Sequence, residues 1–147
     1  MKGSKIHAVV TPDSLPVSIA IGPANEHDSR KLFPLLEGIN IRTGARPRKR
    51  PKEVYADKGY DAPLVRFYLA ARHIKAQIPR RSKKKPPGRP TSFDRDGYKR
   101  CRSSVERFFA WLKEGFRRLE VRHERLASVF FGLVQLASFV IHWRVFG

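Results

Sequence analysis

Two carboxylates set in apolar segments are the residues of this chain best suited to metal chemistry. Asp57 follows the short apolar run at 53–56, and Glu106 lies in a segment with helical spacing. The chain has 13 acidic and 31 basic residues, so acids in such surroundings stand out. Oxygen anions can hold a divalent cation against a phosphate, and a polyanion needs a positive surround. Asp57 and Glu106 are therefore the candidate catalytic and metal-binding residues.

Each of these acids also has a purely structural interpretation. Asp57 begins an Asp-Lys-Gly sequence, which is common in turns. Glu106 stands four residues after Arg102, where an exposed helix often forms an ion pair. Arg102, Glu106 and Lys113 fall at helical positions 0, 4 and 11 and share one face. That face fits a metal-bound phosphodiester and also a salt-bridged surface, so both interpretations stay open.

The composition favours a polyanionic partner, most simply a nucleic acid. The formal net charge is +18 and the isoelectric point is near 11.0. Each neutralised phosphate releases counterions, which drives binding. An RNA-associated protein has less support, because the chain has no aromatic-glycine RNA motif. The single cysteine, Cys101, excludes an intrachain disulfide and a cysteine zinc cluster, which suits a reducing cytosol.

Basic residues concentrate in two stretches that are predicted to be loops. The first covers 42–52 and the second 80–93, of which 80–89 cannot build a core. Cations on loops contact phosphates rather than ordered base edges. The candidate nucleic-acid-binding residues of these loops are Arg48, Lys49, Arg50, Lys83, Lys84 and Lys85.

The hydropathy pattern predicts an α/β order of elements within one domain. Asn25 is a predicted N-cap, Asp61 is another, and the strand at 53–56 should deliver Asp57 to its C-terminal end. The expected elements are a strand hairpin at 5–10 and 17–21, helices after 25 and after 61, short strands at 53–56 and 75–79, a long helix at about 94–120, and an apolar helix from 126.

The apolar helix could in principle cross a membrane. Residues 126–141 are sixteen positions without a charge, fewer than the roughly 18 expected of a membrane span. Apolar residues recur there at helical spacing, with Gln135 and Ser138 between them. The pattern therefore favours a buried core helix over a membrane helix.

Four motifs in order resemble a known family. They are Lys-Gly-Ser-Lys-Ile-His at 2–7, Asn-Glu-His-Asp-Ser at 25–29, Ala-Asp-Lys-Gly-Tyr-Asp at 56–61, and Val-Glu-Arg-Phe-Phe-Ala-Trp-Leu-Lys at 105–113. Together they resemble the catalytic core of insertion-sequence DDE transposases, in the IS-five-like branch of the IS-four-like grouping. The resemblance covers essentially the whole chain.

The resemblance implies a ribonuclease-H-like fold in which three carboxylates bind two divalent ions, Mg²⁺ or Mn²⁺. One ion activates a water or a DNA 3′ hydroxyl, and the other stabilises the leaving oxygen. Asp57 would be the second carboxylate and Glu106 the third. Arg102 and Lys113 match basic positions of the family's last catalytic helix and would contact the DNA backbone, whereas Tyr98 lies one residue before the family's tyrosine.

The family also implies partners and a location. The partners would be DNA, as element ends and target, and further copies of the protein, with no membrane involved. The location would be the prokaryotic cytoplasm, in association with the nucleoid.

The chain departs from this family pattern at its start. The family carries its first Asp on a strand upstream of 2–7, and here no acid precedes Asp13. We therefore expect one incomplete domain over 1–147, without the first catalytic strand and with two long C-terminal helices. The expected function is a transposase core fragment for DNA cleavage and strand transfer, with little activity alone. The alternative is a non-catalytic basic DNA-binding protein that modulates an intact transposase.

Overall fold

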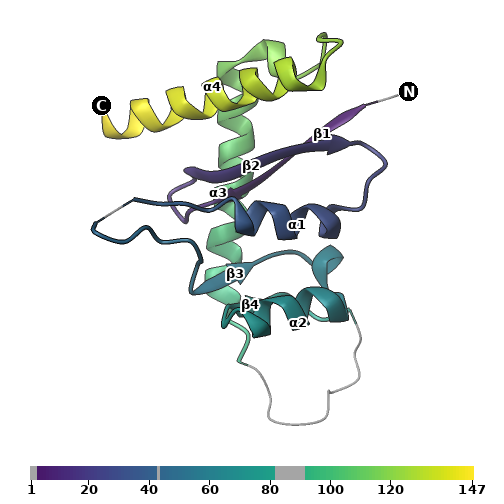
Figure 1. Cartoon of the computed structure of the whole chain (residues 1–147), viewed down its shortest axis with the longest axis vertical. Coiled ribbons are helices and arrows are strands. Elements are labelled where there is room, and N and C mark those ends of the chain that lie inside the picture. Colours follow the sequence, from purple (N-terminus) through teal and green to yellow (C-terminus); the bar gives the residue numbers. More distant parts are fainter. Residues whose placement is uncertain (1–2, 43, 82–91) are drawn as a thin grey trace.

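The computed structural model describes residues 3–42, 44–81 and 92–147, and these form a mixed α/β arrangement (Figure 1). The predicted α/β class is confirmed. In chain order the elements are β1 (Ser4–Val10), β2 (Pro16–Pro23), α1 (Asp28–Glu37), β3 (Glu53–Tyr55), the 3₁₀ turn η1 (Lys58–Tyr60), α2 (Pro63–Ala71), β4 (Lys75–Gln77), α3 (Arg95–Gly115), the 3₁₀ turn η2 (Arg117–Leu119) and α4 (Ala127–Phe146).

The described strands form two small sheets rather than one. β1 and β2 make the predicted antiparallel hairpin, in which Ile6 pairs with Ile21 and Ala8 with Ile19. β3 and β4 pair in parallel. A two-stranded sheet is only marginally stable alone in water, so both sheets depend on the helices that cover them.

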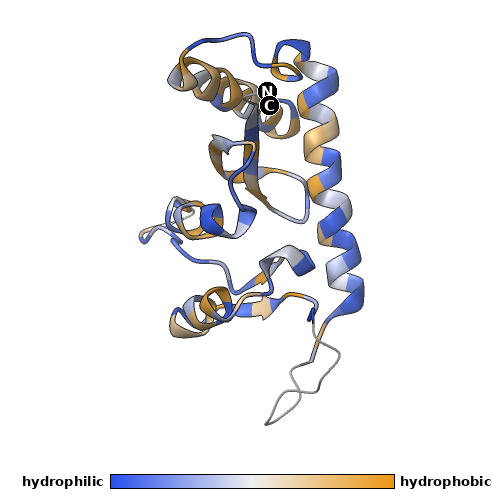
Figure 2. Cartoon of the chain, turned by 90° about the vertical axis from the view of Figure 1, so that its right-hand side faces the viewer, coloured by the Kyte–Doolittle hydropathy of each residue, from blue (hydrophilic) through white to orange (hydrophobic). Residues whose placement is uncertain are grey.

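The helices cover the strands from two sides. In Figure 2, α3 runs along one side of the molecule, the strands lie beside it, and α1 and α2 form the opposite layer. α3 packs on one strand of each sheet, β1 and β3. With 21 residues it is about 30 Å long, enough to cross both sheets. α3 is thus the element that ties the two sheets together.

Two apolar clusters form the core. The first joins α3 to the hairpin and α4, and its centre includes Phe108 and Val134, both with 0% exposure. The second joins α1 and α2 to β3 and β4 around Leu36 and Leu69. Burying one such side chain stabilises the fold by about 1.5–3 kcal/mol. The two clusters therefore hold the two sheets in place.

The starts of the two short helices differ from the prediction. α1 is capped by His27, whose Nδ1 accepts the Ser29 N–H at 3.4 Å, and Asn25 lies in the preceding turn. α2 begins at Pro63 as expected, but it follows Ala62, which makes no side-chain cap. Asp61 instead accepts hydrogen bonds from Arg66 and Arg81, each at 2.7 Å. The Arg66 side chain and the Arg81 backbone N–H therefore bind the carboxylate that the local sequence assigns to a cap.

The two long helices follow the prediction only in part. α3 ends at Gly115 rather than near 120, because Phe116 leaves the helix at φ −140° and ψ 72° and η2 then turns Leu119 into the core. α4 begins after Leu126 as expected, yet it is buried on one face only. It is also long and apolar enough to cross a membrane, a test that core helices of soluble proteins pass as well.

Candidate active site

Asp57 lies directly after β3, where its carboxylate closes a turn. Its Oδ1 accepts the Gly59 N–H at 2.6 Å and so caps η1. A Cβ on Gly59 would stand 2.7 Å from that oxygen, so the turn needs glycine for this close approach. The side chain is exposed. Asp57 therefore has the structural role that its turn sequence predicts, and this role uses one of its two carboxylate oxygens.

Glu106 lies on α3 and forms the ion pair predicted from its spacing. Its Oε1 accepts from Arg102 Nε at 3.0 Å, and the two side chains are 66% and 68% exposed. The hydrogen bond and charge of Glu106 raise the pKa of the Arg102 guanidinium. Exposed i,i+4 pairs contribute only about 0.3–0.5 kcal/mol, so another partner could displace this contact at little cost.

Hydrogen bonds fasten the strand that leads to Asp57 against the helix that carries Glu106. The Tyr55 hydroxyl donates to Asp94 Oδ2 at 3.0 Å, and Asp94 caps α3 by accepting the Gly97 N–H at 2.9 Å. The Asp94 N–H donates to Gln77 Oε1 at the end of β4. The start of α3 is thereby fixed to the C-terminal ends of β3 and β4.

These contacts also shift proton affinities. Burial and the hydrogen bond to Asp94 raise the pKa of Tyr55 to about 12. The Gly97 N–H, and then the Tyr55 hydroxyl, lower the pKa of Asp94 below its usual value. At neutral pH the protonated Tyr55 hydroxyl therefore donates to the ionised Asp94 carboxylate, which caps α3.

A charged cluster at the start of α1 lies near Asp57 and was not predicted from sequence. Asp28 Oδ1 accepts from Lys5 Nζ at 2.8 Å. Tyr60, which ends η1, has its pKa raised to about 12 by burial and then by the charges of Asp28 and Asp57. Two carboxylates from distant segments therefore both oppose the ionisation of one phenol. The Asn-Glu-His-Asp-Ser motif was the available signal for Asp28.

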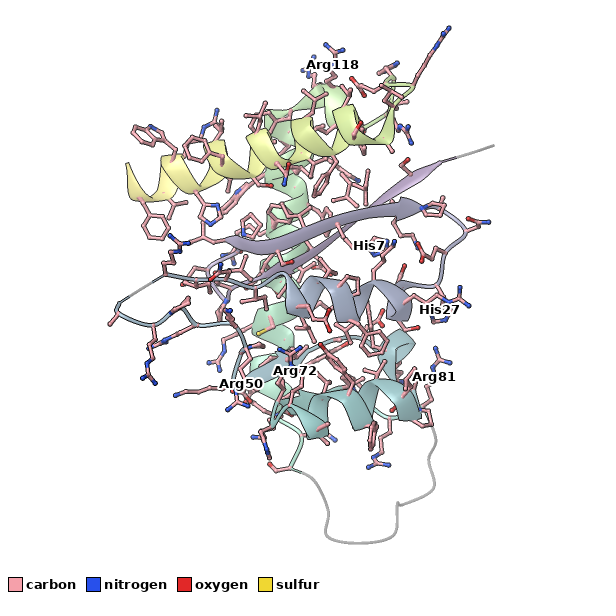
Figure 3. All side chains as sticks on the ribbon, viewed as in Figure 1. His7, His27, Arg50, Arg72, Arg81 and Arg118 are labelled. Atoms are coloured by element: carbon pink, nitrogen blue, oxygen red, sulfur yellow. The ribbon has the colours of Figure 1, made fainter. Side chains whose placement is uncertain are left out.

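Arg81 is a second residue that sequence reasoning missed. Its Nε donates to the Lys58 carbonyl at 2.8 Å and its Nη2 to the Gly59 carbonyl at 3.2 Å. It therefore clamps the turn that follows Asp57. Figure 3 shows Arg81 near one end of α2 and the pair of Arg50 and Arg72 near the other.

The predicted DNA-binding residues occupy different settings. Arg48 exchanges two backbone hydrogen bonds with Ile41, while Arg50 Nη1 donates to the Arg72 carbonyl at 2.8 Å. Lys49 is exposed on the same loop, and Lys113 is exposed near the end of α3. Lys83, Lys84 and Lys85, like most of the loop predicted at 80–93, lie outside the described residues.

The donor set does not by itself fit a site for two divalent ions. Among the residues that the structure describes, no three His, Cys, Asp or Glu side chains gather closely enough to hold a metal ion. Within those described residues, Asp57 and Glu106 share no hydrogen-bond or ion-pair partner: Asp57 accepts from Gly59, and Glu106 pairs with Arg102. The packing brings together Arg102 with Glu106, and β3 with α3, but no complete ligand set.

Comparison with known proteins assigns this basic, mixed α/β protein to a class of transposases. The chain belongs to the transposase DDE domain family, which it matches over residues 1–140, and within it to the insertion-sequence transposases. No solved structure matches the chain.

Three relatives carry transposase names. The chain is 35% identical over 144 residues to a protein named as a transposase for element IS402 of Burkholderia cepacia, covering 97% of this chain and 64% of that protein. It is 31% identical to the transposase of IS1106 from Neisseria meningitidis serogroup B, over 92% of this chain and 42% of that protein. It is 33% identical to a protein named for IS6501 of Brucella ovis, over 96% and 98%. The chain thus spans under two thirds of two relatives and nearly all of the third.

Proposed function

We propose that this chain forms part of the catalytic core of an insertion-sequence transposase, which cleaves DNA at element ends and joins them to a target. Asp57 and Glu106 would be two of its three metal-binding carboxylates. The observation that carries the proposal is that α3, the helix of Glu106, packs along β3, the strand that ends just before Asp57, and is fixed to it at the helix start through Tyr55 and Asp94. The family match supports the reaction class.

The proposal extends to a ribonuclease-H-like sheet that is incomplete in the described residues. The two separate sheets each contribute one strand to the surface under α3, and a further strand between β1 and β3 would join them into one sheet. A strand supplied there would pair with their free edges and could carry the third carboxylate. Placement in the IS-five-like branch belongs to this proposal and rests on the four ordered motifs.

Mg²⁺ or Mn²⁺ would be held by Asp57 and Glu106 together with the missing carboxylate. Such ions lower the barrier by stabilising charge on the attacking and leaving oxygens. The residues of this chain would orient the DNA. Arg102 is positioned by Glu106, and it could turn to a phosphate once Glu106 binds a metal ion.

The basic loops would hold the DNA backbone without reading its sequence. Lys49 and Lys113 are exposed, and Arg81 lies at the turn after Asp57, so each would be available to a DNA phosphate. With a formal net charge of +18, binding should depend strongly on salt. A cytoplasmic location beside the nucleoid follows from a DNA substrate.

A second candidate function is a non-catalytic DNA-binding protein that modulates an intact transposase. The observation in its favour is the incomplete donor set, since the described residues bring no three metal ligands together. DNA binding alone does not separate the two functions, because both predict it. Metal-dependent cleavage does.

The test is nicking of DNA that carries the inverted ends flanking the gene, in Mg²⁺ or Mn²⁺. The chain alone should be nearly silent, because a misplaced ion costs on the order of a hundredfold in rate. A version extended upstream by the family's Asp-bearing strand should cut, and Glu106→Gln should abolish cutting. Glu114→Gln, an exposed acid on the same helix, is the control and should keep activity. An extended protein that binds DNA yet never cuts would favour the second candidate.

A further inference from the structure

The outer face of α4 leaves a row of large apolar side chains uncovered. Five of its large apolar side chains point away from the body of the protein: Val129 is 48% exposed, Leu136 64%, Phe139 63%, Trp143 67% and Phe146 76%. The opposite face packs on β2, α3 and η2. A contiguous apolar surface of this kind usually marks an interaction site.

These five residues fit a coiled-coil period, whereas Val145, which is 49% exposed on the same helix, falls outside it. Together with Gly132 they stand at 129, 132, 136, 139, 143 and 146, which are spacings of three, four, three, four and three. This is the a/d pattern of a heptad, the seam along which two helices pack. We call these six positions the α4 seam. A core helix needs only its inward stripe, so a second, outward stripe with this period indicates a helix as the partner.

The residues beside the seam are compatible with a second copy of the same helix. Ser128, Leu133, Gln135, Val140 and His142 flank it, and none carries a fixed charge. Identical charges would face one another across a self-complementary interface and oppose it, so their absence favours a homodimer. At Gly132 an added Cβ would meet nothing within 4 Å, so the backbone is open to close approach.

The seam is also large enough for a specific pair. Aromatic side chains bury about 150–250 Å² each, so three rings about two-thirds exposed, with Val129 and Leu136, offer on the order of 600 Å² per copy. A pair would then bury roughly 1,200 Å², the lower end of specific interfaces.

We infer that two copies of this chain associate through the α4 seam, helix against helix. This interface needs neither metal nor DNA, and so it stands apart from the proposed catalytic role. With +18 charges on each copy, electrostatic repulsion opposes pairing and salt screens it. Salt should therefore strengthen the dimer while it weakens DNA binding.

Sedimentation equilibrium of the whole chain at low and high salt tests the inference. We expect a dimer whose dissociation constant falls as salt rises. Leu136→Glu should weaken it by roughly a hundredfold, since each dimer loses two buried leucines. Trp143→Gln, a milder change at another seam position, should also weaken it. Phe67→Glu on α2, where Phe67 is 72% exposed, is the matched control and should leave the dimer intact.

Three outcomes would overturn the inference. One is a monomer at every concentration and salt, and another is a dimer that both seam variants leave unchanged. The third is a monomer that binds neutral phosphatidylcholine vesicles and loses that binding in Leu136→Glu, which would assign the seam to a lipid surface. Circular dichroism spectra of the variants should match that of the parent chain, because the substituted side chains are exposed.

Discussion

At the scale of single residues, each of the two candidate carboxylates makes one exposed contact. Asp57 uses Oδ1 to close its turn, and Glu106 uses Oε1 to hold an exposed arginine. Both contacts involve one oxygen each, and neither is buried. Either group could therefore bind a metal ion without disturbing the core. The sequence alone predicts the Glu106 pair through its spacing and the Asp57 turn through Asp-Lys-Gly.

Asp94 is the residue whose ionisation should matter most for the fold around the site. Its pKa is lowered first by the Gly97 N–H and then by the Tyr55 hydroxyl. A carboxyl with a lowered folded-state pKa adds stability above its unfolded value, near 3.9, and loses that stability as pH falls through the folded-state value. Asp94 should thus stabilise the protein at neutral pH and contribute progressively less below about pH 4.

Asp94→Asn keeps a capping oxygen and removes the charge, so it isolates this effect. We expect the variant to melt a few degrees lower than the parent at pH 6–7, with the gap closing as pH drops below about 4. Thermal unfolding followed by circular dichroism measures the gap. Asp13→Asn, an exposed acid without a described partner, serves as the control. A gap that stays constant with pH would show that the charge of Asp94 is not what stabilises the start of α3.

At the scale of elements, the start of α3 depends on a glycine in an unusual place. Gly97 is buried in the first turn, and a Cβ there would collide with the Asp94 carboxylate and the Tyr55 hydroxyl. Glycine inside a helix normally costs about 1 kcal/mol relative to alanine. Here the close approach of the cap and the strand outweighs that cost. The local propensity scale therefore gives the wrong sign at this position.

Gly97→Ala should destabilise the protein by about 1–3 kcal/mol, as overpacked sites do. Gly115→Ala on the same helix, where the nearest atom to an added Cβ is Arg144 Nη1 at 3.8 Å, should be neutral or stabilising. Urea denaturation of both variants gives the two free energies of unfolding. Equal stabilisation by both changes would mean that the Tyr55 and Asp94 contacts yield easily.

The elements also show which parts of the fold local sequence patterns can predict. The hairpin, the strand before Asp57, the Pro63 helix start and the apolar helix after Leu126 were predicted, because alternation, proline and helical spacing are local signals. The cap at His27 was not predicted, although its partner Ser29 is local. The contact of Asp61 with the Arg81 N–H was not predicted either, since that partner is 20 positions away and the tertiary fold brings it close.

At the scale of the whole molecule, the division into two sheets follows from long-range packing that no local period encodes. α3 spans both sheets, and the described residues contain no strand that joins them. DNA binding is also a property of the whole molecule, because a formal net charge of +18 attracts a DNA duplex of any sequence. Loop cations then add contacts to phosphates without distinguishing sequences.

Replacing Lys83, Lys84 and Lys85 by alanine should lower DNA affinity equally for unrelated duplexes. The slope of log K against log salt should flatten by about 0.9 for each phosphate that the protein no longer neutralises. Lys49→Ala should act in the same direction. Lys31→Ala is the control, because Lys31 Nζ already pairs with Glu26 at 3.1 Å. Fluorescence anisotropy across a salt series measures the slopes. A loss confined to one DNA sequence would contradict backbone binding.

Asp57 and Glu106, 49 positions apart in sequence, should come within reach of one metal ion. Fe²⁺ in place of Mg²⁺, with ascorbate and peroxide, generates hydroxyl radicals that cut the protein backbone beside the bound ion. Mapping the fragments by mass spectrometry should reveal cuts near both 57 and 106. Excess Mg²⁺ should suppress both cuts, and either Asp57→Asn or Glu106→Gln should abolish both. Cuts near only one of the two positions, or a cut at one that survives substitution of the other, would contradict a shared site.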